Sequence, residues 1–200
     1  MSTNPRVLAF AGSTRAESFN KKLVRIAAAG ARAGGGEVTL LDLRDFPLPL
    51  FDGDLETREG LPPHARRLKD LMLAHQGLLI SSPEYNSSIS GVLKNAIDWA
   101  SRPVPGEAPL GCFVDKVAAL MSASPGALGG LRGLVYVRAI LGNIKVLVLP
   151  EQVSVSRANE AFNPDGTLKD PKQQAAVEGL GKKLVQVLSK LGARDEEGGI

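Results

Sequence analysis

Five short runs of apolar residues recur along the 200-residue chain, and each is rich in Val, Leu, Ile or Ala. Their apolar character is continuous rather than alternating, which is typical of parallel strands that helices cover on both faces. Amphipathic stretches separate most of the runs, so their order predicts βαβ units. The runs span residues 7–11, 38–41, 78–81, 117–121 and 146–149. We therefore expect an α/β fold, a three-layer sandwich around a five-stranded parallel sheet.

The segments between the runs show the periodicity of helices. In the first of them, Leu23, Ile26 and Ala27 share one side. The predicted helices span residues 20–33, 63–74, 91–101, 131–141 and 173–191. Residues 45–63 contain four prolines and several acidic residues, so they are predicted to form a long surface loop.

The length of the chain allows one compact domain and is too short for two ordinary ones. We expect a single domain over residues 1–192 and a disordered tail at 193–200. The net charge is only +3 and the basic residues are scattered, which argues against a nucleic-acid partner. No apolar stretch is long enough for a membrane span and no signal segment begins the chain, so the expected location is cytoplasmic.

Cysteine and histidine are rare. Cys112 is the only cysteine, which excludes an internal disulfide and a cysteine-based metal cluster, and it is predicted to serve as a small apolar residue. His64 and His75 lie in or beside a polar helical stretch without a carboxylate-rich partner motif. We expect surface roles for both histidines and no metal site.

The first predicted strand runs directly into a loop of small and hydroxyl-bearing residues that ends at a helix. Free backbone N–H groups and the helix dipole make such a terminus an anion site, to which Ser13, Thr14 and Ser18 can donate hydroxyl hydrogen bonds. The spacing lacks the dinucleotide fingerprint and the Walker ending, so a monophosphate fits best. The alternative is that Ser18 only caps the helix and Gly12 only turns the chain.

The third predicted strand ends in Pro83-Glu84-Tyr85-Asn86-Ser87-Ser88. In a sheet of order 2-1-3-4-5, the first and third strands flank the switch point, where ligands bind beyond the carboxyl ends. Tyr85, Asn86 and exposed main-chain amides there can supply the wall and the donors that a flavin ring needs. Glu84 is not expected to act as an acid catalyst, and its backbone amide is predicted to matter more than its carboxylate.

A glycine-rich segment, residues 121–133, follows the fourth predicted strand. Its late position in the sheet argues against a dinucleotide motif. Glycines such as Gly126 let the backbone approach a planar ring closely, and Ser124 can hydrogen-bond a flavin or its ribityl chain. The alternative is a flexible turn into a helix. Arg132 and Arg138 suit either a nicotinamide phosphate or a subunit ion pair, and the sequence does not choose between them.

Two motifs together resemble the NAD(P)H-dependent FMN reductase family, and among its members the bacterial chromate, quinone and azo-dye reductases. One motif joins Gly12-Ser13-Thr14-Arg15 to Ser18-Phe19-Asn20, and the other joins Pro83-Glu84-Tyr85-Asn86 to Leu93-Lys94-Asn95-Ala96-Ile97-Asp98-Trp99. The resemblance covers about residues 6–150. Thr14 stands where relatives often carry leucine, so the acceptor preference of a relative cannot be transferred.

This resemblance implies a flavodoxin-like fold with non-covalent FMN, its phosphate in the loop 13–20 and its ring at residues 83–87. The cofactor-binding residues predicted in this way are Gly12, Ser13, Thr14, Arg15, Ser18, Phe19, Asn20, Pro83, Glu84, Tyr85, Asn86, Ser87, Ser124 and Gly126. It also implies homodimers or homotetramers, in which the helix after Tyr85 forms part of the interface and a neighbouring subunit borders the flavin.

No catalytic triad or acid–base carboxylate pair stands out, as expected where a cofactor carries the reaction, so no catalytic side chain is predicted. We expect ping-pong kinetics: NADH or NADPH reduces FMN and leaves, and a quinone, chromate, azo compound or similar small acceptor takes its place. One alternative is an FMN-binding electron carrier or redox sensor with little reductase turnover. Another is a module that binds a phosphate ligand without flavin.

Overall fold

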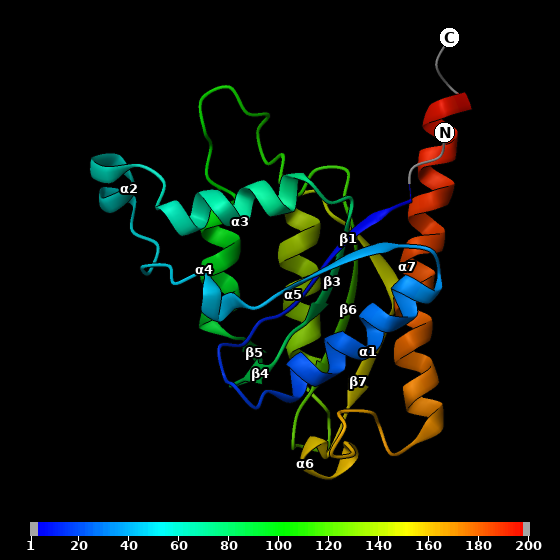
Figure 1. Ribbon diagram of the computed structural model, residues 1–200. Helices are drawn as coiled ribbons and strands as arrows, with labels where there is room; N and C mark the ends of the chain where they lie inside the picture. The colour runs from blue at the N-terminus through cyan, green and yellow to red at the C-terminus, as the bar shows by residue number, and fades with distance from the viewer. Residues whose placement is uncertain (1–3, 198–200) are drawn as a thin grey trace.

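The computed structural model describes residues 4–197, with side chains described to residue 193 (Figure 1). Its central sheet has the strand order β2-β1-β3-β6-β7, and every neighbouring pair is parallel. The strands are β1 Arg6–Ala11, β2 Glu37–Leu41, β3 Gly77–Ser81, β6 Val117–Ala123 and β7 Leu147–Val155. The predicted order 2-1-3-4-5 is therefore confirmed, and it is the order of flavodoxin-like folds.

Helices cover both faces of this sheet (Figure 1). Helices α1 (Phe19–Ala33) and α7 (Pro171–Glu197) lie on one face, and α3 (Pro63–Leu73), α4 (Gly91–Ala100) and α5 (Leu131–Asn143) lie on the other. Successive strand residues point to opposite faces: Val7 and Ala9 of β1 enter the α1–α7 core, and Leu8 enters the other. The three-layer sandwich is thus built from continuous apolar strands.

Two glycines allow α1 and α7 to pack closely. A Cβ atom on Gly30 would lie 2.0 Å from the carbonyl oxygen of Glu178, and one on Gly181 would lie 1.9 Å from that of Ala27. Because no real contact is that short, any larger residue at either position would push the two helices apart.

The segment predicted to be a long loop contains a short helix, α2 (Gly53–Glu59), so this part of the prediction was wrong. Asp52 caps α2 by accepting a hydrogen bond from the Asp54 N–H at 2.8 Å. The helix buries none of its residues, so it leaves no apolar periodicity in the sequence. A 3-10 helix, η1 (Leu43–Asp45), precedes it.

Two short additions lie outside the central sheet. The turn after β3 is a hairpin of β4 (Glu84–Tyr85) and β5 (Ser88–Ile89), and α6 (Ala158–Ala161) follows β7. At the other end of the chain, α7 continues to Glu197, beyond residue 192 where the sequence placed the end of the folded domain. Residues 198–200 of the predicted tail lie outside the described residues.

The interior agrees with the prediction for Cys112 and differs for His75. Cys112 is buried among apolar side chains. His75 is also buried. Its two ring nitrogens lie 2.6 Å from the Leu71 carbonyl oxygen and 2.8 Å from Thr39 Oγ1. The predicted surface role of His75 is therefore wrong, and its polar atoms are satisfied by α3 and β2.

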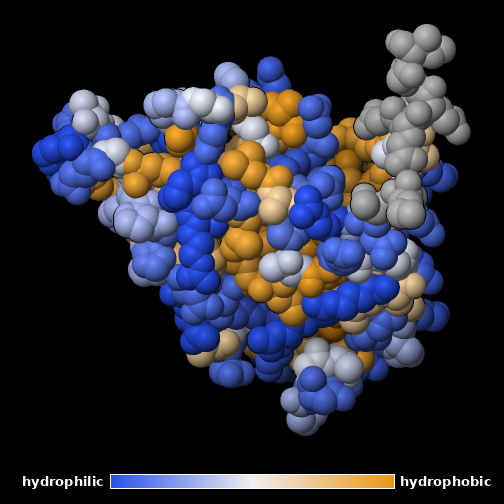
Figure 2. Space-filling view, turned by 45° about the horizontal axis from the view of Figure 1, so that its top comes forward, coloured by the Kyte–Doolittle hydropathy of each residue, from blue (hydrophilic) through white to orange (hydrophobic). Residues whose placement is uncertain are grey.

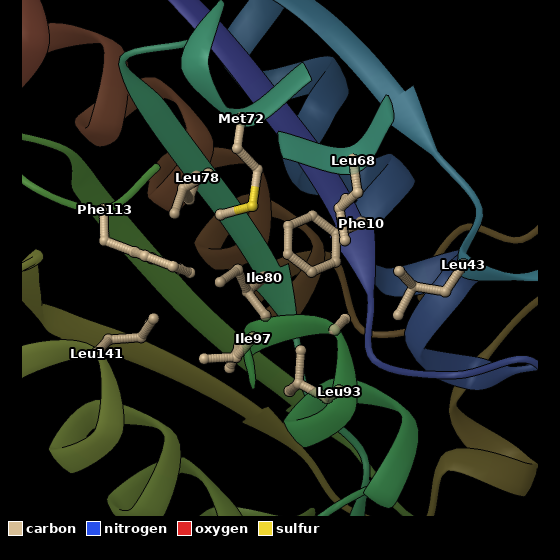
Figure 3. Close-up of a pocket in the computed structure, with 11 residues that line it drawn as sticks. Phe10, Leu43, Leu68, Met72, Leu78, Ile80, Leu93, Ile97, Phe113 and Leu141 are labelled. Atoms are coloured by element: carbon tan, nitrogen blue, oxygen red, sulfur yellow. The ribbon is translucent and has the colours of Figure 1, made fainter. Parts of the chain in front are cut away.

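The core under α3, α4 and α5 is tightly filled. Figure 3 shows side chains from β1, β3 and these helices pointing toward one another, among them Phe10, Ile80 and Leu141. The space left between them is about 10 Å³, which is about enough for one water molecule. This apolar centre is packing, and the candidate ligand site lies elsewhere.

Candidate functional site

Three loops meet at the carboxyl ends of neighbouring strands. They are residues 12–18 after β1, 82–90 after β3 and 124–130 after β6. The Gly12 N–H donates to the Ser81 carbonyl at 2.9 Å, and the Ser82 N–H donates to the Met121 carbonyl at 2.8 Å. The sheet therefore brings the three predicted motifs to one edge, which is where ligands bind in doubly wound folds.

Asn20 fastens these loops together. Its side-chain Nδ2 donates to the Ala123 carbonyl at 2.9 Å, and its Oδ1 accepts from the Ala123 N–H at 3.0 Å and from Ser81 Oγ at 2.8 Å. The residue is only 3% exposed. The amide of Asn20 thus holds α1 against the ends of β3 and β6, with both acceptor sites of its oxygen and one N–H of its nitrogen engaged by protein.

The loop after β1, residues 12–18, contains polar groups that are available to hydrogen-bond a ligand. Ser18 is the N-cap of α1 and is only 4% exposed as a residue, yet its hydroxyl makes no capping hydrogen bond. Ser13 is also buried, and its Oγ accepts a long hydrogen bond of 3.3 Å from the Arg15 N–H. Within the described chain, the N–H groups of Thr14 and Ala16 have no backbone acceptor. An anion at this helix start would satisfy these donors, so a phosphate group fits the loop.

The cationic side chains beside this loop differ in whether a carboxylate of the chain already pairs with them. Lys21 Nζ contacts Asp42 Oδ2 at 2.7 Å. Burial tends to raise the pKa of the Asp42 carboxyl, but hydrogen bonds from Lys21 and from the Arg44 N–H outweigh it, and the pKa lies below its ordinary value. Lys21 is therefore neutralised by Asp42. Arg15 is exposed and pairs with no carboxylate of the described residues, so it is the cation left for an anion.

The aromatic hairpin presents its tip to solvent. Pro83 is buried, while Tyr85 is 50% exposed and Asn86 is also exposed. Asn86 and Ser87 have positive φ angles of 50° and 64°, the pattern of a type I′ hairpin turn. An exposed tyrosine on an otherwise well-packed edge is suited to covering a planar ligand.

The glycine-rich turn is fixed to the segment after β7. The Ser124 N–H donates to the Val155 carbonyl at 3.1 Å, and the Ala158 N–H donates to the Ser124 carbonyl at 3.1 Å. Ser124 Oγ makes only a 3.4 Å contact with the Gly126 N–H. The backbone of Ser124 is thus anchored, and its hydroxyl is left nearly free at the shared edge. Phe19 stacks on Phe162 with a ring separation of 5.9 Å, which supports α1 from the same side.

Sequence reasoning missed two contacts of the site. Ser90 caps α4 by accepting from the Leu93 N–H at 3.2 Å, and its Oγ donates to the Gly12 carbonyl at 2.6 Å. Glu84 accepts hydrogen bonds from Arg132 Nε and from the Gly133 N–H, both at 3.0 Å. A serine directly before a helix was a usable signal for the first contact. No local signal connects Glu84 to residues nearly fifty positions away.

A cleft of about 290 Å³ adjoins the loop after β1 at Thr14. Its lining is mostly apolar and comes from the loop itself, from the segment after β2 and from α4: Thr14, Leu43, Arg44, Phe46, Pro47, Leu48, Val92, Asn95 and Ala96. Figure 2 shows one face of the molecule on which apolar residues gather in the middle and hydrophilic residues surround them. The loop of residues 12–18 therefore opens onto space of ligand size.

The sequence of this fold matches a known family over most of its length. Residues 5–160 match the family described as NADPH-dependent FMN reductase. The chain belongs to this family. The resemblance seen in the two motifs is thereby confirmed, and this FMN reductase family member is an oxidoreductase whose chemistry involves a flavin and NAD(P)H.

Individual relatives agree with the family. An NAD(P)H-dependent FMN reductase of Pseudomonas aeruginosa is 36% identical over 179 residues, 89% of this chain and 92% of the relative. A quinone reductase of Escherichia coli is 34% identical over 149 residues, 74% of this chain and 76% of the relative. The solved structure of FerB, a flavoenzyme NAD(P)H:(acceptor) oxidoreductase from Paracoccus denitrificans, has 30% identity and a TM-score of 0.75, covering 93% and 98% of the two chains.

Among the described residues, no helix combines the length and the apolar character that crossing a membrane requires.

Proposed function

We propose that this FMN reductase family member holds FMN non-covalently at the shared loop edge, takes electrons from NADH or NADPH and delivers them to small acceptors such as quinones, chromate or azo compounds. The observation that carries the proposal is the Ser18 hydroxyl at the start of α1, which makes no capping hydrogen bond although the residue is only 4% exposed, in a chain whose family reduces flavin. This hydroxyl is free to donate a hydrogen bond, and a phosphate monoester supplies a charged acceptor for it.

The proposed phosphate contacts are the first-loop hydroxyls and amides together with the Arg15 guanidinium. Ser13, Thr14 and Ser18 would donate through their hydroxyl groups, and the positive end of the α1 dipole favours the same dianion. Gly12 contributes by staying small, since a Cβ there would lie 2.9 Å from the Leu93 Cβ. The α4 start can therefore lie directly against the loop.

The proposed ring contacts come from the hairpin and the glycine-rich turn. Tyr85 offers an aromatic wall. The N–H groups of Asn86 and Ser87 have no backbone acceptor among the described residues and are thus free to donate to a ligand. Ser124 offers its hydroxyl, and the exposed backbone at Gly126 permits close approach. Phe19, Asn20, Pro83 and Glu84 support the site from behind, through packing and through the contacts described above.

Bound FMN would supply the redox chemistry, accepting hydride from the reduced nicotinamide and passing the electrons on. The chain's part is to orient the ring and to leave one face accessible beside the exposed Tyr85. Main-chain donors at the ring edge would stabilise negative charge that develops there. Donor and acceptor would use the same space in turn, so the expected steady-state pattern is ping-pong.

A homodimer or homotetramer is part of the proposal. The outer side of α4 is partly covered by its own chain, because Asn95 Oδ1 accepts from the Phe51 N–H at 2.8 Å and Trp99 Nε1 donates to the Pro49 carbonyl at 2.8 Å. Exposed apolar side chains instead gather along α5 at Leu131, Val135 and Tyr136. We therefore expect α5, which lies on the same face of the sheet as α4, to be the centre of the subunit contact. The cytoplasmic location expected from the sequence stays a prediction.

The test is an absorbance spectrum of the protein after reconstitution with FMN and desalting, followed by anaerobic addition of NADPH or NADH. Retained flavin whose absorbance bleaches supports the reductase and identifies its donor. Retained flavin that stays oxidised favours an electron carrier or sensor. Loss of all flavin on desalting contradicts a resident cofactor, and FMN would then be a substrate at most.

A further inference from the structure

The hairpin that carries Tyr85 has an unfavourable backbone. Its two-residue loop places Asn86 and Ser87 in the left-handed region, at φ angles of 50° and 64°. Asparagine tolerates this conformation, but serine is a poor choice for it. The two strands are only two residues long each, and so short a hairpin is not stable by itself. Contacts from outside the hairpin must hold it.

The strongest of these contacts come from one carboxylate. Glu84 Oε1 accepts from Arg132 Nε at 3.0 Å and contacts Arg132 Nη2 at 2.9 Å, while Oε2 accepts from the Gly133 N–H at 3.0 Å. The Glu84 side chain is only 9% exposed, whereas that of Arg132 is 58% exposed, so water screens the ion pair more than it screens the hydrogen bond from Gly133. Both carboxylate oxygens are occupied by α5.

Glu84 also takes the place of a missing cap. The N-cap of α5 is Gly130, which has no side chain to satisfy the first N–H groups of the helix. The Gly133 N–H is the group that an N-cap side chain would normally bind, and a negative charge there matches the helix dipole. A Cβ on Gly133 would lie 3.3 Å from both Glu84 Cβ and the Ser88 carbonyl oxygen, so the hairpin lies directly on the helix.

We propose that Glu84 and Arg132 form a positioning pair, which clamps the strained hairpin to the start of α5 and thereby fixes Tyr85 and the turn amides for the flavin ring. The consequence for flavin rests on the proposed function. The α5 terminus is accordingly occupied by Glu84, which leaves the phosphate to the α1 terminus alone. The pair touches neither donor nor acceptor and acts only through the turn.

The clamp itself is tested on flavin-free protein by hydrogen–deuterium exchange. Glu84→Gln and Arg132→Gln are expected to speed exchange at both residues 84–90 and 128–134, by about threefold or more, and the double variant is expected to add little beyond the larger single effect. Lys94→Gln is the matched control, because it breaks an i,i+4 ion pair of 2.7 Å with Asp98 on the adjacent helix. Unchanged exchange in the Glu84 and Arg132 variants, or independent effects that simply add, would overturn the clamp.

The positioning role is tested by titrating each variant with FMN and with riboflavin, which lacks the phosphate. Loss of the clamp is expected to weaken both ligands by the same factor, about tenfold. Ser18→Ala, in the phosphate loop, is expected to weaken FMN and leave riboflavin unchanged. If the wild type binds flavin and the clamp variants bind both ligands normally, the positioning role is wrong while the proposed function stands. If the wild type binds neither ligand, the proposed function and the positioning role both fail, and the exchange result still decides the clamp.

Discussion

At the residue scale, neighbouring residues of one motif have different roles. The family resemblance assigns both Ser18 and Asn20 to the cofactor. The structure gives Asn20 three buried hydrogen bonds to protein, whereas the Ser18 hydroxyl has no capping partner. The sequence motif groups the two residues because they follow the same strand. Only the three-dimensional contacts show that Asn20 supports the fold, whereas the Ser18 hydroxyl stays available to a ligand.

This difference predicts opposite phenotypes. Asn20→Ala leaves the N–H and carbonyl of Ala123 unpaired in the interior, and we expect it to lower the free energy of unfolding by about 2–4 kcal/mol. Ser18→Ala removes no capping bond, so the expected loss is below about 0.5 kcal/mol, while FMN binding weakens. Urea unfolding of the flavin-free variants measures both values. Equal stability of the two variants would contradict the structural role of Asn20.

At the scale of elements, ion pairs attach the long segment 101–116 to α3. Lys69, only 4% exposed at its side chain, donates to the Arg102 carbonyl at 2.8 Å and lies 3.3 Å from Glu107 Oε2. Arg66 pairs with the same carboxylate. Burial tends to raise the pKa of Glu107, but the hydrogen bonds and charges of Arg66 and Lys69 outweigh it and hold the pKa below its ordinary value of 4.5.

A carboxyl whose pKa is lower in the folded state stabilises the protein above its unfolded pKa, and the effect disappears as the pH falls through the folded pKa. Glu107→Gln is therefore expected to be less stable than the wild type near neutral pH, and the difference is expected to shrink below about pH 4.5. Urea unfolding at several pH values measures this. Asp98→Asn, which loses only a surface pair, serves as the control with an expected change below about 0.5 kcal/mol. A difference that stays constant with pH would show that the charge of Glu107 is not the cause.

The sequence predicts well those helices and strands whose buried apolar residues recur at regular spacing along the chain. All five central strands and the helices α1, α3, α4, α5 and α7 contribute to the two apolar cores, and their apolar patterns located them, except that β7 continues to Val155, beyond the predicted run 146–149. Helix α2 buries none of its residues and depends on the Asp52 cap, so no apolar periodicity in the sequence predicted it. The hairpin of β4 and β5 is held by Glu84 through α5, a contact between distant segments that local propensity does not contain.

At the scale of the whole molecule, the predicted strand order places the candidate site at one edge of the sheet. Because β1, β3 and β6 are adjacent and parallel, the loops that follow them meet at one edge. The residues of the three motifs were therefore brought together as predicted. Their division between ligand contact and support was not predictable, because it depends on partners such as Ala123 and Arg132 that are distant in sequence.

The surface of α5 gives the last prediction. Leu131 and Val135 lie four residues apart on α5 and are 40% and 60% exposed, the adjacent Tyr136 is 51% exposed, and Leu128, in the turn before the helix, is 50% exposed. If a second copy covers this surface, Val135→Glu places a charge inside the contact, and we expect sedimentation velocity to show a monomer where the wild type sediments as a dimer or tetramer. Leu191→Glu is the control, since Leu191 is 38% exposed on α7, across the sheet from α5. The proposed contact is wrong if Val135→Glu leaves the sedimentation coefficient of an oligomeric wild type unchanged, or if the wild type is itself a monomer.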